Sequence, residues 1–354
     1  MLDGTNARAM ETHSRARISV IVPVHNGGDA LGRCLRALAS AVPPAHEVVV
    51  VPDGESDGAW RGAERYGARV LAPGAGPRGP AHARNRGAAA ANGDILFFVD
   101  ADVAAHAGAM AIVAGALHGD PALDAVIGSY DDAPGDPAFL SQYRNLLHHY
   151  THQHARQDAM TFWGACGAIR REVFLDVGGF DEGYTRPSVE DIELGYRLRR
   201  AGRRIALVRD LQVTHLKAWT AVDMVRTDFL RRALPWTALL LRERRFDSDL
   251  NIDGRNRLSV ALALSLVATL ALAVAWPALV GVAAIMGQLL LLVNARLYRF
   301  FAAKRGSIFA LRAIPWHWLH YLSSGLAFIV GVVRHVAAPA PAGGPARTLA
   351  PQAQ

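Results

Sequence analysis

The sequence predicts an α/β fold with a doubly wound parallel sheet, followed by apolar helices that can cross a membrane. Two observations predict it. Between residues 18 and 219, short apolar runs alternate with helical stretches, and short polar links join them, as is typical of parallel sheets. From 258 to 333, charges nearly vanish outside one basic patch, and the apolar runs there suit a bilayer span. The chain therefore divides into an α/β half and a membrane half.

The composition narrows the function classes. Hydrophobic residues make up 51% of the 354 residues and charged residues only 19%, which is apolar for a wholly soluble protein. The two cysteines, Cys34 and Cys166, form neither a disulfide framework nor a metal-ligand pattern. The net charge of +7 comes from arginines concentrated before the apolar segments, which favours anionic lipid over nucleic acid as a partner.

The elements of the α/β half follow from the apolar pattern. Strands are expected where apolar, β-branched runs lie between polar turns, at 18–22, 48–51, 69–71, 95–99, 125–128 and 204–208. Helices are expected at helical spacing or where alanine dominates, at 31–38, 59–66, 81–91, up to 117, at 139–156 and at 188–200. Three strands end in polar loops, and right-handed crossovers bring these loops to one edge of the sheet.

Two carboxylates one residue apart follow the most apolar strand, 95–99. Asp100 and Asp102 would repel each other unless a cation or a proton lies between them. Hard oxygen ligands suit Mg²⁺ or Mn²⁺, which fill their remaining positions with phosphate and water. The alternative is a loop aspartate followed by a helix-capping Asp102, and this short pattern alone does not decide between the two.

Four motifs in order resemble the family 2 glycosyltransferases. They are Val20-Ile21-Val22-Pro23-Val24-His25-Asn26, Val49-Val50-Val51-Pro52-Asp53-Gly54-Glu55-Ser56-Asp57, Ala83-Arg84-Asn85-Arg86-Gly87 and Phe98-Val99-Asp100-Ala101-Asp102. The resemblance covers 18–216 and implies a GT-A fold, which is a Rossmann-like mixed sheet. One departure is Pro52, which stands where the family has an acid before Asp53.

The resemblance also implies a nucleotide-diphospho-sugar donor and a divalent metal, Mg²⁺ or Mn²⁺. Asp53 would accept a hydrogen bond from the nucleotide base. The implied donor-binding residues are Pro23, Val24, Asn26, Asp53, Arg84 and Asp100. The implied metal ligands are Asp100, Asp102 and His215, the last just after the final strand. A lone histidine there is equally consistent with a structural role.

A second group of motifs resembles the acceptor side of the same family. Small residues between aromatics at 161–171 let a ligand approach the backbone, and the candidate residues there are Trp163, Gly164 and Gly167. The turn at 177–182 precedes a helix that Ser188 can cap, with Glu190 and Asp191 in its first turn. The helix dipole alone explains those acids. The resemblance instead makes Asp191 the general base on the acceptor hydroxyl, with Glu190 in support.

Four histidines lie on the predicted helix 139–156. His148 and His152 are one turn apart and could hold a metal, but neither Cys nor Glu follows at matching spacing. The sequence favours a solvated helix face.

The membrane half begins with an amphipathic helix. Residues 220–245 mix arginines with Trp and Leu, which predicts a helix on the bilayer surface, with a linker to 257. Two or three spans are expected within 258–335, at 258–276, 278–292 and 308–333. Arginines flank the first two spans, so the positive-inside rule predicts a multi-pass protein of the cytoplasmic membrane with its catalytic domain in the cytosol. The ends, 1–17 and 336–354, are expected to be disordered.

The sequence therefore predicts a membrane-bound, metal-dependent, inverting glycosyltransferase with a lipid-linked or cell-surface glycan acceptor. One alternative is a nucleotidyltransferase, which needs a Gly-rich basic signature after the first strand, where His25-Asn26-Gly27-Gly28 stands instead. Another is a non-catalytic membrane scaffold, which would not need Asp100, Asp102 and Asp191. Processive members of the family carry Gln-x-x-Arg-Trp after the base, and Leu234-Pro235-Trp236 lacks it, which favours single addition.

Overall fold

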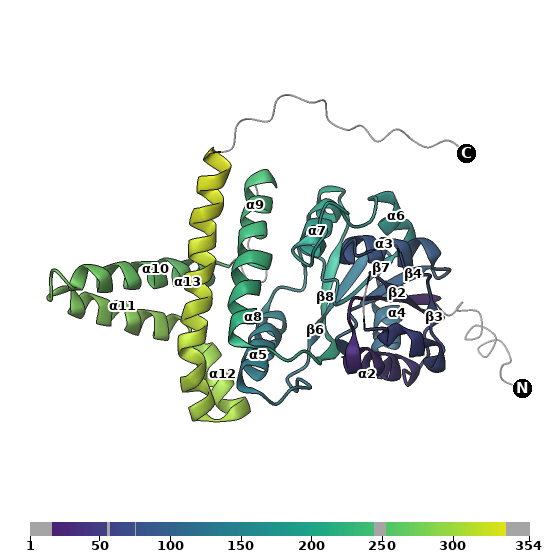
Figure 1. Cartoon of the computed structure of the whole chain (residues 1–354), viewed down its shortest axis with the longest axis horizontal. Coiled ribbons are helices and arrows are strands. Elements are labelled where there is room, and N and C mark those ends of the chain that lie inside the picture. Colours follow the sequence, from purple (N-terminus) through teal and green to yellow (C-terminus); the bar gives the residue numbers. More distant parts are fainter. Residues whose placement is uncertain (1–15, 55–56, 75, 244–252, 338–354) are drawn as a thin grey trace, which may run out of the picture.

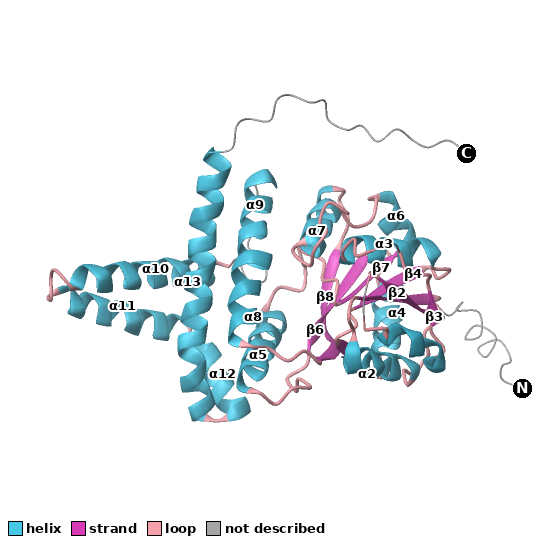
Figure 2. Cartoon of the chain, viewed as in Figure 1, coloured by secondary structure: helices cyan, strands magenta, loops and turns pink. Residues whose placement is uncertain are grey.

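The computed structural model describes residues 16–54, 57–74, 76–243 and 253–337 (Figure 1). An α/β domain lies at one end and a group of long helices at the other (Figure 2). Most of the two segments predicted to be disordered, 1–17 and 336–354, lies outside the described residues, as do Glu55 and Ser56 of the second motif.

Eight strands form one mixed sheet in the order β3-β2-β1-β4-β7-β6-β8-β5. The strands are β1 (Ile18–Val24), β2 (Glu47–Pro52), β3 (Arg69–Val70), β4 (Ile95–Val99), β5 (Val103–Ala105), β6 (Ala125–Tyr130), β7 (Cys166–Arg170) and β8 (Ile205–His215). The first four strands in the chain pair in parallel, as predicted. Because β7 runs antiparallel to both β4 and β6, the sheet is mixed rather than wholly parallel.

The core lies on both faces of β4, whose five residues are all buried. Phe98 makes an edge-on contact with Phe180 at a ring separation of 5.1 Å and a tilted contact with Phe174 at 5.3 Å. Packing of this kind anchors the strand that carries Asp100 and Asp102 at its carboxyl end. The predicted burial of this strand is confirmed, but it is parallel only to β1.

The helices of the α/β domain lie close to their predicted positions. They are α2 (Gly28–Ala39), the 3₁₀-helix η1 (Ala59–Tyr66), α3 (Pro80–Ala90), α4 (Ala109–Gly119), α5 (Phe139–His154), α6 (Arg171–Asp176) and α7 (Glu190–Arg200). Several features differ from the expectation. Helix α6 and strand β7 have no counterpart among the predicted ranges. The short strand β5 precedes α4, and β8 continues well beyond residue 208 to His215.

The predicted amphipathic helix is divided into α8 (Ala221–Arg226), the π-helix η2 (Thr227–Ala233) and α9 (Leu234–Glu243). Buried Leu239 and Leu240 pack with Val189 and Tyr196 of the α/β domain. On another side, α9 runs along α13 (Ser307–Ala337), as Figure 1 shows. The apolar face of α9 thus has protein partners, and its contact with a bilayer surface stays a prediction.

The remaining helices include a hairpin of α10 (Gly254–Ala273) and α11 (Leu279–Val293), which projects sideways from α13 (Figure 1). Within the described residues, two helices, α10 and α13, are long and apolar enough to cross a bilayer. A third span is possible if α11 counts together with α12 (Ala295–Arg305), from which it is bent by 62°. Many large apolar side chains of the hairpin are exposed, among them Val267, Leu272 and Trp276.

A buried polar cluster ties the base of the hairpin to α13. Asn294, at the bend, donates from Nδ2 to Ser259 Oγ at 3.0 Å and accepts from the Tyr321 hydroxyl at 2.8 Å. All three residues are buried. Hydrogen bonds between buried groups fix relative positions, so the hairpin leaves the protein in a set direction.

One glycine lets α7 pack directly against the backbone of the segment that precedes β7. A Cβ on Gly195 would lie 2.3 Å from Phe162 N and 2.5 Å from Thr161 Cα. Because those atoms belong to the backbone, we expect Gly195→Ala to destabilise the protein by about 1–3 kcal/mol in denaturant unfolding. The control is Gly115→Ala on α4, where a Cβ meets nothing within 4 Å. Here a gain of up to about 1 kcal/mol is expected. Equal effects of the two substitutions would contradict the packing argument.

Candidate functional site

A cavity of about 1050 Å³ opens at the carboxyl ends of β1, β2 and β4. It is lined by most residues that the sequence singled out, namely Pro23, Val24, Asn26, Asp53, Arg84, Asp100, Asp102, Trp163, Glu190, Asp191 and His215. Gly164 and Gly167 do not line it. Three polar loops therefore meet at one edge of the sheet, as the crossover argument predicted.

Arg84 on α3 lies between two carboxylates. It donates from Nη2 to Asp100 Oδ1 at 2.7 Å and from Nη1 to Glu190 Oε1 at 2.9 Å. Arg84 and Glu190 are both only 4% exposed. Burial disfavours the charge of Arg84, but the surrounding carboxylates outweigh it and raise the pKa of the guanidinium above its usual value. Arg84 thus links the strand-end acid to the first turn of α7.

Asp191 is held at the N-terminus of α7 with its carboxylate toward the cavity. Its Oδ2 accepts from the Gly164 N–H at 3.0 Å and its Oδ1 from the Ile192 N–H at 2.8 Å. Burial and the neighbouring Glu190 raise the pKa of Asp191 to about 6. A carboxylate of that basicity can take a proton near neutral pH.

The structure corrects one detail of this helix. Val189, not Ser188, occupies the cap position, and its side chain makes no cap hydrogen bond. The backbone N–H of Ser188 instead donates to Glu190 Oε2 at 2.8 Å. The Glu190 carboxylate in the first turn of the helix therefore accepts hydrogen bonds from both the Ser188 N–H and Arg84.

Asp102 and His215 form the second half of the site. Burial and repulsion from Asp100 raise the pKa of Asp102 to about 6. His215 Nε2 lies 3.9 Å from Asp102 Oδ2, and burial lowers the pKa of the ring to about 3, so it stays neutral. Its ring stacks on Tyr130 at a centroid separation of 4.3 Å.

This donor set fits a divalent cation that takes its other ligands from a substrate. A neutral imidazole and a carboxylate are both metal ligands, and a cation would relieve the repulsion that raises the pKa of Asp102. Among the residues that the structure describes, no group of three or more His, Cys, Asp or Glu side chains could hold a metal. Mg²⁺ in particular needs only one or two protein carboxylates beside phosphate oxygens.

Asp53 is engaged with the backbone of the Gly-rich loop. Its Oδ1 accepts from the Arg78 N–H and its Oδ2 from the Gly79 N–H, both at 2.8 Å. Gly54, at φ +60°, lets the loop approach closely, because a Cβ there would lie 2.1 Å from Pro77 N. Asp53 thus shapes this end of the cavity, and its bond to a nucleotide base stays a prediction.

The predicted acceptor-side residues have different positions. Trp163 lies on the cavity wall, edge-on to Tyr130 at 4.9 Å. Gly164 donates a hydrogen bond from its N–H to Asp191 Oδ2, and a Cβ on Gly164 would lie 2.9 Å from the Arg84 guanidinium carbon. Gly167 is within β7, and a Cβ would lie 2.4 Å from the Trp163 carbonyl oxygen. Only Trp163 is placed to touch a ligand.

The solvated histidine face predicted on α5 is wrong. His152 is buried and makes a hydrogen bond through Nδ1 with the Gly128 carbonyl, and His148 packs 5.1 Å from the Trp163 ring. Burial lowers the pKa of both imidazoles. They form the floor behind Trp163.

Sequence reasoning missed a basic wall of the same cavity. It is formed by Arg144, Lys217, Arg231 and Arg232. Arg144 forms a buried ion pair with Asp228 of η2. Among the described residues, Arg232 has neither a hydrogen bond nor an ion pair, and burial lowers its pKa. The signal was the arginine pair of the amphipathic helix, which was interpreted as facing lipid headgroups.

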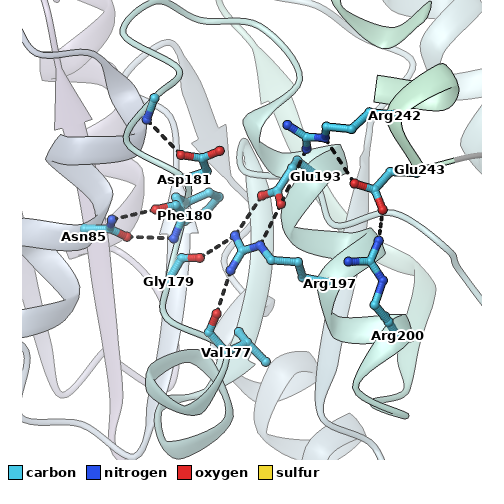
Figure 3. Close-up of polar contacts among 11 residues, drawn as sticks. Asn85, Val177, Gly179, Phe180, Asp181, Glu193, Arg197, Arg200, Arg242 and Glu243 are labelled. Carbon is cyan, nitrogen blue, oxygen red and sulfur yellow. Dashed lines mark hydrogen bonds and ion pairs between the residues drawn. The ribbon is translucent and has the colours of Figure 1, made fainter. Parts of the chain in front are cut away.

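Polar contacts fix α7 from both sides (Figure 3). Arg197 binds the carbonyl groups of Val177 and Gly179 at 2.6 Å, and Asn85 pairs with both backbone groups of Phe180. On the other side, Arg200 of α7 forms an ion pair with Glu243 of α9. The helix that carries Asp191 is therefore joined to the segment that leads to the candidate membrane-spanning helices.

The Arg84 bridge should contribute strongly to stability. Replacing Arg84 by methionine leaves Glu190 buried without its partner, and we expect a loss of about 3–5 kcal/mol in unfolding free energy. The matched control is Arg17→Met, which removes the exposed pair with Asp94. This control should hardly move the unfolding midpoint. Similar losses in both variants would contradict the assigned weight of the bridge.

Comparison with known proteins identifies relatives of the α/β half. The model of Glycosyl transferase family 2 matches residues 19–178. A validoxylamine A glucosyltransferase from Streptomyces hygroscopicus subsp. limoneus is 30% identical over 54% of this chain and 50% of its own length. A pre-mycofactocin glycosyltransferase from Mycobacterium tuberculosis is 30% identical over 62% of this chain and 48% of its own. The chain thus spans about half the length of these relatives.

A solved structure shares the fold over most of the chain. It is a mannosyltransferase from Pyrobaculum calidifontis in complex with GDP-Man and Mn²⁺. The two superpose with a TM-score of 0.53 at 20% identity, covering 92% of this chain and 88% of the other. This likeness confirms the predicted mixed-sheet architecture.

Proposed function

We propose that the chain transfers a sugar from a nucleotide-diphospho-sugar to an acceptor hydroxyl, because residues 19–178 match the model of Glycosyl transferase family 2 and the fold is shared with a solved mannosyltransferase. The observation that carries the proposal is the position of Asp191. A half-buried carboxylate, with its pKa raised to about 6, shares one cavity with the strand-end pair Asp100 and Asp102.

The donor would lie along the carboxyl edge of the sheet. Pro23, Val24 and Asn26 line one end of the cavity beside Asp53 and suit the nucleoside. The basic wall supplies positive charge for the diphosphate, and Arg231 and Arg232 form no ion pair within the described parts of the chain. Arg84 acts indirectly, since both sides of its guanidinium already bind carboxylates.

The transfer needs one base and a stabilised leaving group. Asp191 accepts the proton of the acceptor hydroxyl, whose oxygen bonds to the anomeric carbon as the bond from that carbon to the diphosphate breaks. The electron pair of the broken bond leaves with the nucleoside diphosphate. This single displacement inverts the anomeric centre and requires no covalent intermediate.

Asp102 and His215, with Asp100 beside them, would hold Mg²⁺ or Mn²⁺. The ion would supply Lewis-acid stabilisation of the charge that develops on the diphosphate. The role of Asp100 is partly structural, because its Oδ1 already accepts from Arg84.

The acceptor is proposed to be lipid-linked or a cell-surface glycan. The candidate spans α10 and α13 belong to the same chain, and exposed apolar side chains cover the hairpin. Arginines at the base of the hairpin support a cytosolic catalytic domain on a multi-pass protein of the cytoplasmic membrane.

A panel of nucleotide-diphospho-sugars tests the proposal. The full-length protein in detergent with Mn²⁺ should release nucleoside diphosphate from one class of donor, and NMR of the transferred sugar would report its configuration. Release of pyrophosphate from a nucleoside triphosphate and a sugar phosphate would support the nucleotidyltransferase alternative. Donor binding without turnover under any condition would support the scaffold alternative.

A further inference from the structure

A second pocket lies where the α/β domain meets the hairpin, and it shares no lining residue with the cavity that contains Asp191. Its volume is about 560 Å³, and its walls come from α5, α10 and α12. Its polar and aromatic lining residues are Tyr150, His154, Arg255, Arg296, Arg299 and Phe300. Nothing in the proposed sugar transfer uses this pocket.

Three cations converge on this pocket without carboxylate partners. Within the described parts of the chain, Arg255, Arg296 and Arg299 have no hydrogen bond or ion pair, and all three are exposed. The acid nearest in sequence, Asp253, accepts instead from the Asn256 N–H as the cap of α10. Like charges that gather without internal neutralisation favour binding of an external anion.

The other wall is aromatic. Tyr150 packs on Phe300 at 5.2 Å and on His154 at 4.0 Å. Guanidinium groups bind phosphate through paired hydrogen bonds, and aromatic rings are enriched at the headgroup level of bilayers. The pocket therefore combines the two features that recognise a phosphate next to an apolar phase.

The position of the pocket at the base of the hairpin favours a lipid as the source of that phosphate. Arg255 is the second residue of α10, and Arg296 is the second residue of α12, just after the bend at Asn294. From this base the hairpin continues with exposed apolar side chains such as Leu258 and Leu292. A phosphate in the pocket would thus lie where the apolar surface begins, which suits a molecule with acyl chains.

We propose that this pocket binds the phosphate headgroup of an anionic phospholipid whose acyl chains lie along the α10–α11 hairpin. A topogenic role of the same arginines requires only their presence near the spans. The convergence of residues from three helices, one of them from the α/β domain, goes beyond that role. The lipid would join α5, which carries Arg144 and His148 of the active cavity, to the membrane hairpin.

Native mass spectrometry of the full-length protein in detergent tests the proposal with phosphatidylglycerol as the probe. We expect one tightly retained phosphatidylglycerol and weaker retention of zwitterionic phosphatidylcholine. Arg299→Gln should weaken this binding about fivefold, and Arg296→Gln/Arg299→Gln about 25-fold, at roughly 1 kcal/mol for each arginine. The matched control is Arg334→Gln, an exposed arginine at the far end of α13, which should bind as the wild type does.

Three outcomes would overturn the proposal. Equal retention by Arg299→Gln and Arg334→Gln would show general surface attraction. Equal retention of phosphatidylcholine would remove the role of headgroup charge. Displacement of the lipid by millimolar inorganic phosphate would show a site for a free anion. Arg299→Lys, which keeps the charge, should bind better than Arg299→Gln and controls for loss of folding. None of these readouts depends on sugar transfer.

Discussion

Replacing Asp191 by asparagine is expected to lower the rate of sugar transfer by about 10²–10⁴-fold, the usual contribution of a positioned general base. The substitution keeps the size of the side chain, and its amide oxygen can still accept from the Gly164 N–H. Donor binding should therefore change little. Steady-state kinetics with the donor and acceptor found in the screen would show a fall in kcat with an almost unchanged KM for the donor.

A second aspartate beside α7 provides the control. Asp158 is exposed and pairs with Arg199 of this helix at 2.9 Å, so Asp158→Asn removes a carboxylate that contacts the same helix but lies outside the cavity. Activity should remain near that of the wild type. If Asp191→Asn turned over as fast as Asp158→Asn, another group would have to be the base.

The pH profile gives an independent readout of the same residue. The base must be deprotonated, and the pKa of Asp191 is raised to about 6. The value of kcat/KM should thus be level above pH 7 and fall about tenfold per unit below pH 6. A divalent cation held by Asp102 would lower the pKa of that carboxyl and keep it ionised, so with saturating metal the acid limb would report on Asp191. A limb near pH 4 would contradict the raised pKa.

Replacing Asp102 by asparagine, or removing divalent cations, is expected to lower activity by about 10²–10³-fold. A metal ion stabilises the leaving diphosphate by several kcal/mol, and each 1.4 kcal/mol is about a factor of ten. Chelation with EDTA followed by added Mn²⁺ should abolish and restore turnover of the wild type. Electron paramagnetic resonance would show weaker Mn²⁺ binding by Asp102→Asn in the presence of nucleoside diphosphate.

The matched control is Asp120→Asn. This substitution removes an exposed carboxylate that pairs with Arg204 near the amino ends of β6 and β8, outside the cavity. Mn²⁺ binding and turnover should not change. Full activity of the wild type in EDTA would mean that the cation has no part in the reaction, and the pair of acids would then need another explanation.

The parts of the fold with a strong local pattern could be predicted from the sequence. The run 95–99 is apolar on every residue, so its burial and the position of Asp100 and Asp102 at its end follow directly. Its antiparallel pairing with β7 could not be predicted, because β7 is distant in the chain and consists mainly of small residues. Strand β5 has only three residues, which is too short for a periodic signal.

The site was predictable where a motif carried it and not where tertiary packing did. Periodicity showed that Arg231 and Arg232 lie on a polar helix face, but a polar face can meet solvent, lipid headgroups or a cavity. The π-helical turn η2 brings both to the cavity. Likewise, the spacing of His148 and His152 showed that they share a face, while only the fold shows that Trp163 covers it.

The ion pair between Arg200 and Glu243 links the helix that carries Asp191 to the helices that could contact lipid. It joins α7 to α9, α9 packs along α13, and α13 meets the hairpin through Tyr321 and Asn294. A thinner or thicker bilayer changes the tilt of its spanning helices through hydrophobic mismatch. If α10 and α13 span the bilayer, this series of contacts would transmit such a tilt to α7, and turnover in vesicles should then have an optimum acyl-chain length.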